Sequence, residues 1–320
     1  MKIRTLISAS VAAAALLSAG PAFADAHTEA PAPAPAAAAA AADPAAETEL
    51  PSGPEGPALW KVADEDTTIY LFGTVHALPA DLVWYDAEID AALNSSDTVV
   101  TEILMDPASE AAMQEIAIAK GMFTDGTTLR TLLDEEQTAA YETALVSLGV
   151  PPVAFDQFEP WMAGLTLGVL PLLQQGYDLQ AGVDKIILSK AGDTPQDALE
   201  TAEFQLGIFD GLPQDQQIEF LMGAVEGMGE AATMLDSMVA EWADGDADGL
   251  AAIMNENMDD EAFAAALLYD RNANWAEWIE ARLDSTPGTV FIAVGAGHLA
   301  GERSVQDYLA QRDIETTRVQ

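Results

Sequence analysis

Two of the three histidines in this sequence follow a glycine at the same spacing. His76 ends "GTVH" and His298 ends "GAGH", so each closes a G-x-x-H sequence directly after an apolar run. A third β-branched run, "TVVTEI", reaches Glu102 near its end. Two imidazoles and one carboxylate suit a divalent first-row metal and leave coordination positions open for water and substrate. The pattern therefore raises the question of metal chemistry at the ends of strands.

The three residues are expected to lie together if their strands share one sheet. Ligands gather beyond the carboxyl ends of strands in open α/β sheets, and neighbouring strands lie about 4.8 Å apart. Gly73, Gly295 and Gly297 are expected to let the backbone turn sharply and approach a ligand closely. The residues alone leave an equal alternative, in which both histidines are merely hydrogen-bonded at the sheet edge.

Two further charged residues have a functional and a structural interpretation each. Glu200 is predicted to be a general base for an activated water or a partner of a histidine, or else an ordinary carboxylate at a helix start. Arg271 shares a predicted helical face with Trp275 and Trp278. It is predicted to clamp a substrate carboxylate or oxyanion, or else to form a cation–π contact or ion pair that fixes the helix. Asn272, the next residue, is a candidate supporting residue.

The elements that must position these residues follow from periodicity and composition. Strands at both ends of the folded region surround a mostly helical middle, so we predict an α/β or α+β fold with a mixed sheet. The predicted strands are 58–63 and 67–73, which form a hairpin, then 97 to about 102, 197–200, 288–295 and 314–320. Helices are predicted at 80–93, through much of 107–283, and at 302–312.

The N-terminal 57 residues differ from the rest in composition. Residues 1–24 combine Lys2 and Arg4 with a short apolar stretch and a small-x-small site at Ala22–Ala24, as in a secretory signal peptide. Residues 25–57 are rich in Ala and Pro and are predicted to be a disordered spacer, which also contains His27. Residues 58–320 are predicted to form one domain. We therefore expect a periplasmic or secreted protein with no integral membrane segment in the mature chain.

Composition narrows the chemistry further. The chain has no cysteine, which excludes thiolate nucleophiles, thiolate metal sites and iron–sulfur clusters. Without residues 1–24, 10 basic residues face 53 acidic ones, a net charge of −43. Such a charge repels phosphate backbones, so we expect no nucleic-acid partner. Nitrogen and oxygen ligands leave Mn, Co, Fe or Zn as the candidate divalent metal, and the sequence predicts no oligomeric state.

Six segments in order resemble the TraB/GumN family, also written TraB/PrgY/GumN. This family is related to the Tiki proteins, which are described as metal-dependent proteases. The segments are "LFGTVHALP", "VVTEI", "AGVDKIILSKA", "ALETAEFQLGIFDGLPQDQ", "DRNANW" and "FIAVGAGHLAGERSVQDYL".

The resemblance implies that His76, Glu102 and His298 are the metal and catalytic residues. It assigns no role to Asp184, which lies in the third segment. The predicted function is a periplasmic metal-dependent hydrolase acting on a peptide or small-molecule substrate. The alternative is a non-catalytic envelope protein that binds a peptide or small ligand in the same cleft.

Overall fold

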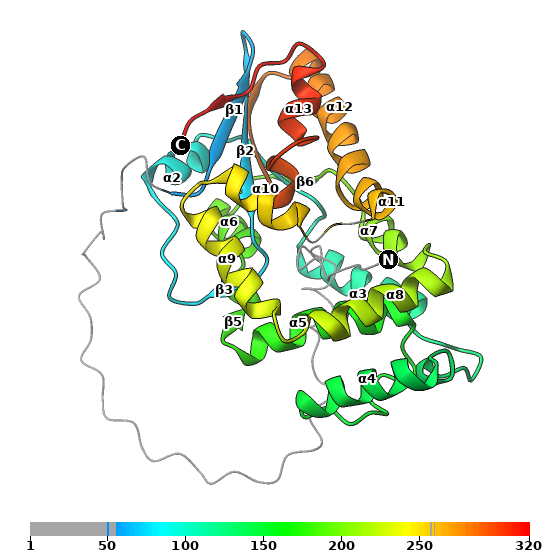
Figure 1. The fold of residues 1–320 in the computed structure, drawn as a ribbon. Helices are drawn as coiled ribbons and strands as arrows, with labels where there is room; N and C mark the ends of the chain where they lie inside the picture. The colour runs from blue at the N-terminus through cyan, green and yellow to red at the C-terminus, as the bar shows by residue number, and fades with distance from the viewer. Residues whose placement is uncertain (1–49, 51–55, 257, 259) are drawn as a thin grey trace.

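The computed structural model describes residues 50, 56–256, 258 and 260–320. The predicted signal peptide and nearly all of the predicted spacer lie outside these residues. Figure 1 shows a β-sheet at one end of the molecule and a layer of helices at the other. Within the described ranges, no helix has both the length and the apolar character needed to cross a membrane.

The main sheet has six strands in the order β6-β4-β7-β2-β1-β8. The strands are β1 (Leu59–Ala63), β2 (Thr67–Thr74), β4 (Thr98–Thr101), β6 (Gln196–Ala198), β7 (Gly288–Gly295) and β8 (Thr317–Arg318). The first four in spatial order are parallel, whereas β1 runs antiparallel to both β2 and β8. A separate two-stranded sheet joins β3 (Leu78–Pro79) to β5 (Tyr177–Asp178). The sheet is therefore mixed, with four parallel strand ends at one edge.

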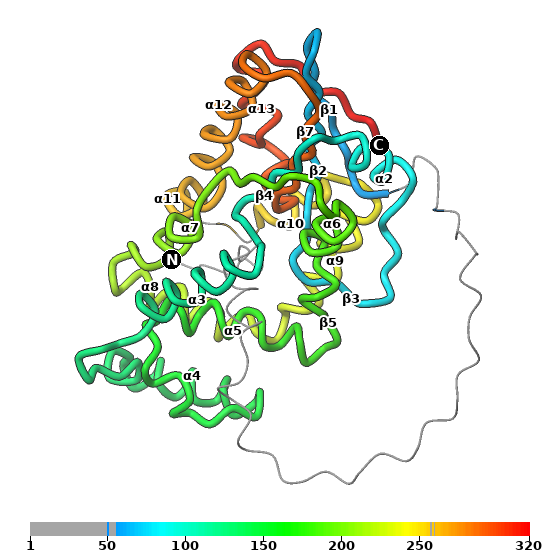
Figure 2. The backbone as a smooth tube through the Cα atoms, turned by 180° about the vertical axis from the view of Figure 1, so that it is seen from behind, coloured from blue at the N-terminus to red at the C-terminus, as the bar shows by residue number. Residues whose placement is uncertain are grey.

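Helices cover both faces of the sheet because its strands are apolar on both sides. In β7, Phe291 and Ala293 belong to one buried cluster, and Val290, Ile292 and Val294 belong to the other. The first cluster is covered by α2 (Ala87–Asn94) and α6 (Val183–Ala191), and the second by α12 (Asp270–Ser285) and α13 (Val305–Ala310). Figures 1 and 2 show these helices on opposite sides of the strands.

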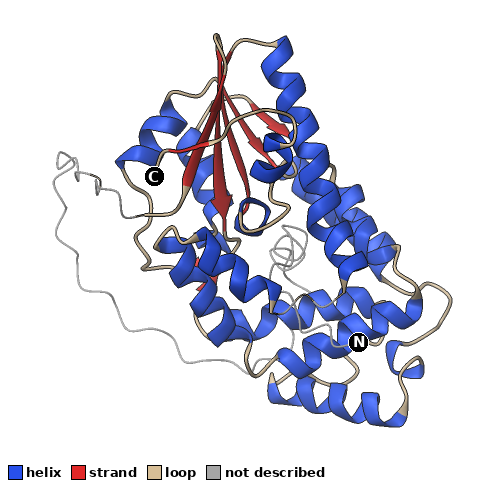
Figure 3. Ribbon diagram, turned by 45° about the horizontal axis from the view of Figure 1, so that its top comes forward, coloured by secondary structure: helices blue, strands red, loops and turns tan. Residues whose placement is uncertain are grey.

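The remaining helices form the region beyond the sheet, as Figure 3 shows. They are α3 (Pro107–Gly121), α4 (Glu135–Ser147), α5 (Pro160–Gln174), α7 (Ala202–Asp210), α8 (Gln214–Gly227), α9 (Ala231–Ala243), α10 (Ala247–Asn255) and α11 (Glu261–Ala264). Short 3-10 helices are η2 (Leu129–Thr131), η3 (Leu179–Ala181) and η5 (Ala296–Leu299). A π-helix, η4 (Ala265–Tyr269), leads from α11 into α12.

Local sequence accounts for several of these helix starts. Asp86, Asp106 and Asp134 each accept hydrogen bonds from backbone N–H groups in the first turn of α2, α3 and α4. These side chains satisfy donors that have no partner within the helix. Pro107 adds the fixed φ suited to the first position of α3.

The predicted fold class is confirmed, including the N-terminal hairpin and the buried strand 288–295. The predicted helix at 302–312 is shorter, at Val305–Ala310, and the predicted strand at 314–320 contracts to Thr317–Arg318. Neither the β3–β5 sheet nor the π-helix was predicted. Each β3 and β5 strand has only two residues, too few to show a period of two.

Candidate active site at the carboxyl edge of the sheet

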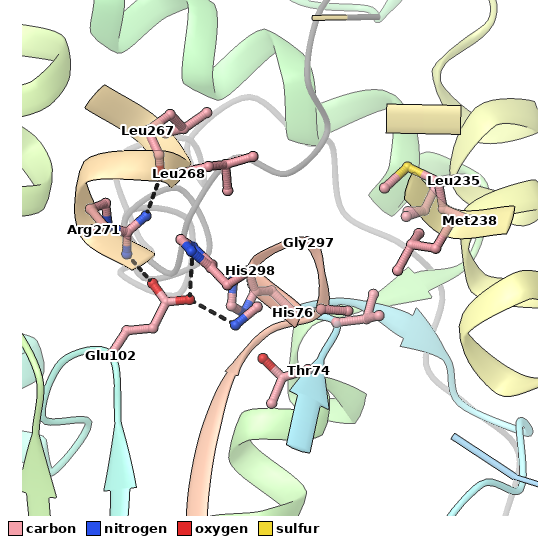
Figure 4. Close-up of a pocket in the computed structure, with 14 residues that line it drawn as sticks. Thr74, His76, Glu102, Leu235, Met238, Leu267, Leu268, Arg271, Gly297 and His298 are labelled. Carbon is pink, nitrogen blue, oxygen red and sulfur yellow. Dashed lines mark hydrogen bonds and ion pairs between the residues drawn. The ribbon is translucent and has the colours of Figure 1, made fainter. Parts of the chain in front are cut away.

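Three parallel strands end beside one another and deliver the predicted site residues. In the strand register, Thr74 at the end of β2 pairs with Gly295 at the end of β7, and Thr101 of β4 pairs with Ala293. His76, Glu102 and His298 follow these ends by two, one and three residues. All three line one pocket of about 600 Å³, a volume that includes its open mouth. Figure 4 shows them around its polar side.

The first histidine is held by a carboxylate. Nδ1 of His76 lies 2.7 Å from Oδ2 of Asp184, which is buried in α6. A carboxylate accepts hydrogen bonds, so Nδ1 carries the proton and Nε2 keeps a lone pair. Burial lowers the pKa of His76, but the charge and hydrogen bond of Asp184, aided by the Glu102 charge, outweigh it and raise the pKa above its ordinary value.

Backbone contacts bring Asp184 to this histidine. The N–H of Val183 donates to the carbonyl of Val75 over 2.9 Å. A Cβ on Gly182 would lie only 2.3 Å from the His76 carbonyl oxygen, so a larger residue would push the two segments apart. The segment "AGVD" therefore places the Asp184 carboxylate beside the His76 ring. Asp184, to which the family resemblance assigned no role, orients this histidine.

The second histidine is held by an amide instead. Nδ1 of His298 lies 2.6 Å from Oδ1 of Asn272, whose Nδ2 donates to the carbonyl of Arg303. This second bond fixes which end of the amide faces the ring. The imidazole also packs on Trp275, with 4.2 Å between ring centroids. Burial, followed by the nearby Arg271 charge, lowers the pKa of His298 to about 3. The ring is therefore neutral, with its proton on Nδ1.

Glu102 is ionised although it is buried. Its Oε1 accepts the N–H of Gly295 at 2.8 Å and lies 3.8 Å from Nε2 of His298. Its Oε2 accepts from Arg271 at 2.6 Å and from Gln205 at 2.8 Å. Burial raises the pKa of Glu102, but the Arg271 charge, the two histidines and the Gly295 hydrogen bond together hold it well below its usual range.

Arg271 and Glu200 are bound to each other and to the site. Nε of Arg271 donates to Glu200 at 2.8 Å, and Nη1 donates to the carbonyl of Leu267 in the π-helix at the same distance. The guanidinium lies 4.9 Å from the Trp275 ring, and the indole N–H of Trp275 donates to Glu200. Gln205 donates to Glu200 as well as to Glu102. Arg271 thus has the ion pair and the cation–π contact of its structural interpretation, whereas Glu200 contacts Arg271, Trp275 and Gln205 and neither histidine.

The three candidate glycines have ordinary backbone conformations and close neighbours. Gly73, Gly295 and Gly297 all avoid positive φ, so none of them makes a turn that only glycine permits. They permit close packing within the chain. A Cβ on Gly73 would lie 3.0 Å from the backbone of Ala296, and one on Gly297 would lie 2.3 Å from Cε of Met254. Close packing, and not a positive φ, therefore explains glycine at positions 73 and 297, and a close approach of these glycines to a ligand stays a prediction.

The imidazole and carboxylate donors of His76, Glu102 and His298 are of the types that bind a divalent ion. Only part of their spacing suits one. The Nε2 lone pairs of His76 and His298 belong to rings whose Nδ1 atoms are already engaged, which is the usual arrangement of metal-binding histidines. The 3.8 Å between Glu102 and His298 suits two ligands of one ion. Within the described residues, however, no group of three or more His, Cys, Asp or Glu side chains has the geometry to hold a metal ion.

Two residues of this site were not predicted from sequence. Gln205 bridges Glu102 and Glu200 from α7, and Thr74 lines the pocket at the end of β2. Thr74 lies within the first G-x-x-H sequence, so that motif was the available signal. Gln205 lies five residues after Glu200 on the following helix, and nothing in its own residue type indicated the contact.

Fold and site together define an α/β protein with two G-x-x-H imidazoles and a carboxylate at parallel strand ends. The model of the TraB/PrgY/gumN family matches residues 58–318, and the chain belongs to this family. Neither a curated protein nor a solved structure matches the chain.

Proposed function

We propose that this protein is a metal-dependent hydrolase of the periplasm, acting on a peptide or small-molecule substrate. The proposal is based on the net charge of the side chains gathered around the two histidines. Glu102, Glu200 and Asp184 contribute three carboxylates, and Arg271 contributes one guanidinium. With His298 neutral, the formal charge is −2 when His76 is neutral and −1 when His76 is protonated. Buried charges need compensation, and one divalent cation supplies it.

The chain's own residues would divide the work around such an ion. Nε2 of His76, Nε2 of His298 and Oε1 of Glu102 are the candidate ligands. A divalent ion there would supply Lewis-acid activation of a water at neutral pH. Asp184 and Asn272 hold the two rings with Nε2 available, while Arg271 and Gln205 hold the far oxygen of Glu102. Glu200 acts through Arg271 and Trp275 and is a positioning residue.

Cation binding at this site would compete with protons at His76. Asp184 stabilises a protonated ring there, and the pKa of His76 is raised. A metal ligand must be neutral, so binding would release that proton. His298 carries no such cost because its pKa is about 3. Metal affinity is therefore expected to fall as the pH is lowered through the pKa of His76.

A ligand-binding module is the second candidate. The observation in its favour is the apolar side of the pocket, formed by Leu235, Met238, Leu250, Leu267 and Leu268. Pockets that bind ligands combine such a surface with a few placed polar groups. This alternative needs no ion and no bond cleavage.

Peptide cleavage separates the two candidates. The protein would be treated with a chelator, resupplied with Mn²⁺, Co²⁺, Fe²⁺ or Zn²⁺, and incubated with a peptide library read by mass spectrometry. The hydrolase predicts cleavage that needs the metal and is lost in Glu102→Gln. Arg312→Gln is the matched control because its ion pairs lie at the surface. Peptides that are retained but never cleaved, with every metal, would favour the binding module.

A further inference from the structure

Thr74 carries a buried hydroxyl that the fold leaves without a partner. It is the last residue of β2 and is only 3% exposed. Among the described residues, none forms a hydrogen bond with its Oγ1. Thr74 also lines the pocket that contains His76, Glu102 and His298. In Figure 4 its hydroxyl oxygen lies on the side of the Glu102 carboxylate and the imidazoles.

Other buried threonines differ from Thr74. Thr67 begins the same strand, is 2% exposed, and its hydroxyl donates to the carbonyl of Thr286 and to Asp66. The hydroxyl of Thr101, at the end of β4, donates to the carbonyl of Ile103 at 2.7 Å. Thr166, within α5, donates to the carbonyl of Met162 at 2.8 Å. Of the four threonines buried in the described part of the chain, only Thr74 has a hydroxyl with no partner among the described residues.

An unpaired buried hydroxyl lowers stability, whereas valine has the same shape and no such penalty. A hydroxyl at this position is therefore best explained by a partner that enters the pocket. The nearby polar atoms of His76, His298 and Glu102 offer lone pairs, so they suit a cation or a donor. The Thr74 hydroxyl can donate, so it complements them by serving an acceptor oxygen.

We propose that the Thr74 hydroxyl donates a hydrogen bond to the carbonyl oxygen of an acyl substrate, an amide or an ester. This inference rests on the proposed hydrolase function and assigns that function a substrate class. A donor at that oxygen stabilises the negative charge that develops there when water attacks the carbonyl carbon. No bond to Thr74 forms or breaks. The hydroxyl is a substrate-positioning group beside the residues that activate the water.

Four proteins test the inference: the wild-type chain, Thr74→Val, Thr74→Ser and Thr67→Val. The first measurement is thermal unfolding in the presence of a chelator. Thr74→Val is expected to be at least as stable as the wild type, because it loses an unpaired hydroxyl. Thr67→Val removes a paired hydroxyl at the other end of the same strand, and its Tm is expected to fall by about 2–4 °C.

The second measurement uses Co²⁺-loaded protein and two probes, acetohydroxamate and azide, read by visible absorption. Acetohydroxamate has a carbonyl oxygen and azide has none. Thr74→Val is expected to weaken acetohydroxamate binding about fivefold, the size of one net hydrogen bond, and to leave azide binding unchanged. Thr74→Ser, which keeps the hydroxyl, is expected to bind both probes as the wild type does.

Three results would overturn the inference. Unchanged acetohydroxamate binding in Thr74→Val means that the hydroxyl does not serve a carbonyl oxygen. Equal weakening of both probes means that it serves water or the ion instead. A Thr74→Val protein destabilised as much as Thr67→Val means that the hydroxyl is paired within the fold. If the wild type binds none of Mn²⁺, Co²⁺, Fe²⁺ or Zn²⁺, the proposed function fails and this inference fails with it, whereas the three results above overturn the inference alone.

Discussion

The two G-x-x-H loops present the same residue to one pocket in two different environments. His76 has a side chain 17% exposed and a carboxylate at Nδ1, whereas His298 is 5% exposed and has an amide there. The pKa of His76 is raised by Asp184, and that of His298 is lowered to about 3 by burial and Arg271. One motif thus yields a ring that is protonated more readily than an ordinary imidazole and a ring that stays neutral.

The difference shows that the surroundings of each ring, and not the motif, set its pKa: Asp184 for His76, and burial with Arg271 for His298. An aspartate supplies charge that stabilises a protonated ring, whereas an asparagine orients the ring without that charge. The His298 side also contains the buried Arg271, whereas the His76 side chain is more exposed. In the folded protein, the His298 ring is therefore expected to stay neutral near pH 7, whereas the His76 ring is expected to gain a proton more readily.

Removal of Arg271 is expected to give the largest effect. Arg271→Met would leave Glu102 and Glu200 buried without their cation, at a cost of about 3–5 kcal/mol in the free energy of unfolding. Arg312→Met, which loses only surface ion pairs, should cost less than about 1 kcal/mol. Urea unfolding at pH 7 measures both. Equal losses would show that the His298 side is no more dependent on buried charge than the surface is.

The pH dependence of stability should come mainly from His298 between pH 6.5 and 5. Its folded pKa of about 3 lies below the unfolded value of 6.5, so the unfolded chain binds more protons in this window. Stability is then fully present above pH 6.5 and is lost as the pH falls, by roughly 2 kcal/mol at pH 5. His298→Gln should flatten this slope in urea unfolding of the chelated protein.

His76 should act in the opposite direction. Its folded pKa is raised, so its contribution is present below pH 6.5 and is lost as the pH rises through the folded pKa. His76→Gln should therefore destabilise the protein more at pH 6 than at pH 8. The slope of the free energy of unfolding against pH should therefore differ between the variants. A slope that is unchanged in His298→Gln, or the same in both variants, would show that the two loops do not differ in this way.

Exchanging the two residues that contact the histidine Nδ1 atoms should have the smallest effect on stability. It should change the pKa values of the two histidines clearly. Asp184→Asn removes the charge at His76 and should lower its pKa, while Asn272→Asp adds a charge at His298 and should raise its pKa. Ring proton resonances in the metal-free protein report both values by NMR titration. Should each pKa stay where it was, burial and not the Nδ1 partner would govern the two rings.

The sheet and its strand ends could be predicted because they depend on local sequence. The apolar runs before His76, Glu102 and His298 are strands, and parallel strands end at one edge. The orienting groups could not be predicted in the same way. Asp184 and Gln205 lie on helices of the long middle region, and helical periodicity does not define how a helix docks.

The ion-pair partners of Arg271 and Glu200 could not be predicted from the sequence either. Sequence indicated that Arg271 shares a face with Trp275, and the structure has that contact. It did not indicate that the partner of Arg271 is Glu200, 71 positions away, together with Glu102. Tertiary contacts decide whether a buried arginine is free to bind a substrate or is already paired within the protein. The roles of the glycines were missed for the same reason, since Met254 and Ala296 pack against them from elsewhere in the chain.

The central claim is that the two G-x-x-H loops form one divalent metal site, and metal stoichiometry tests it most directly. The chelated protein would be dialysed against Mn²⁺, Co²⁺, Fe²⁺ or Zn²⁺ at pH 7.5 and its metal content measured. We expect one ion per chain for at least one metal, loss of that ion in both His76→Ala and His298→Ala, and no loss in His27→Ala, which removes the histidine outside both loops. A wild-type chain that retains none of these ions, or an ion kept after either loop histidine is removed, would contradict it.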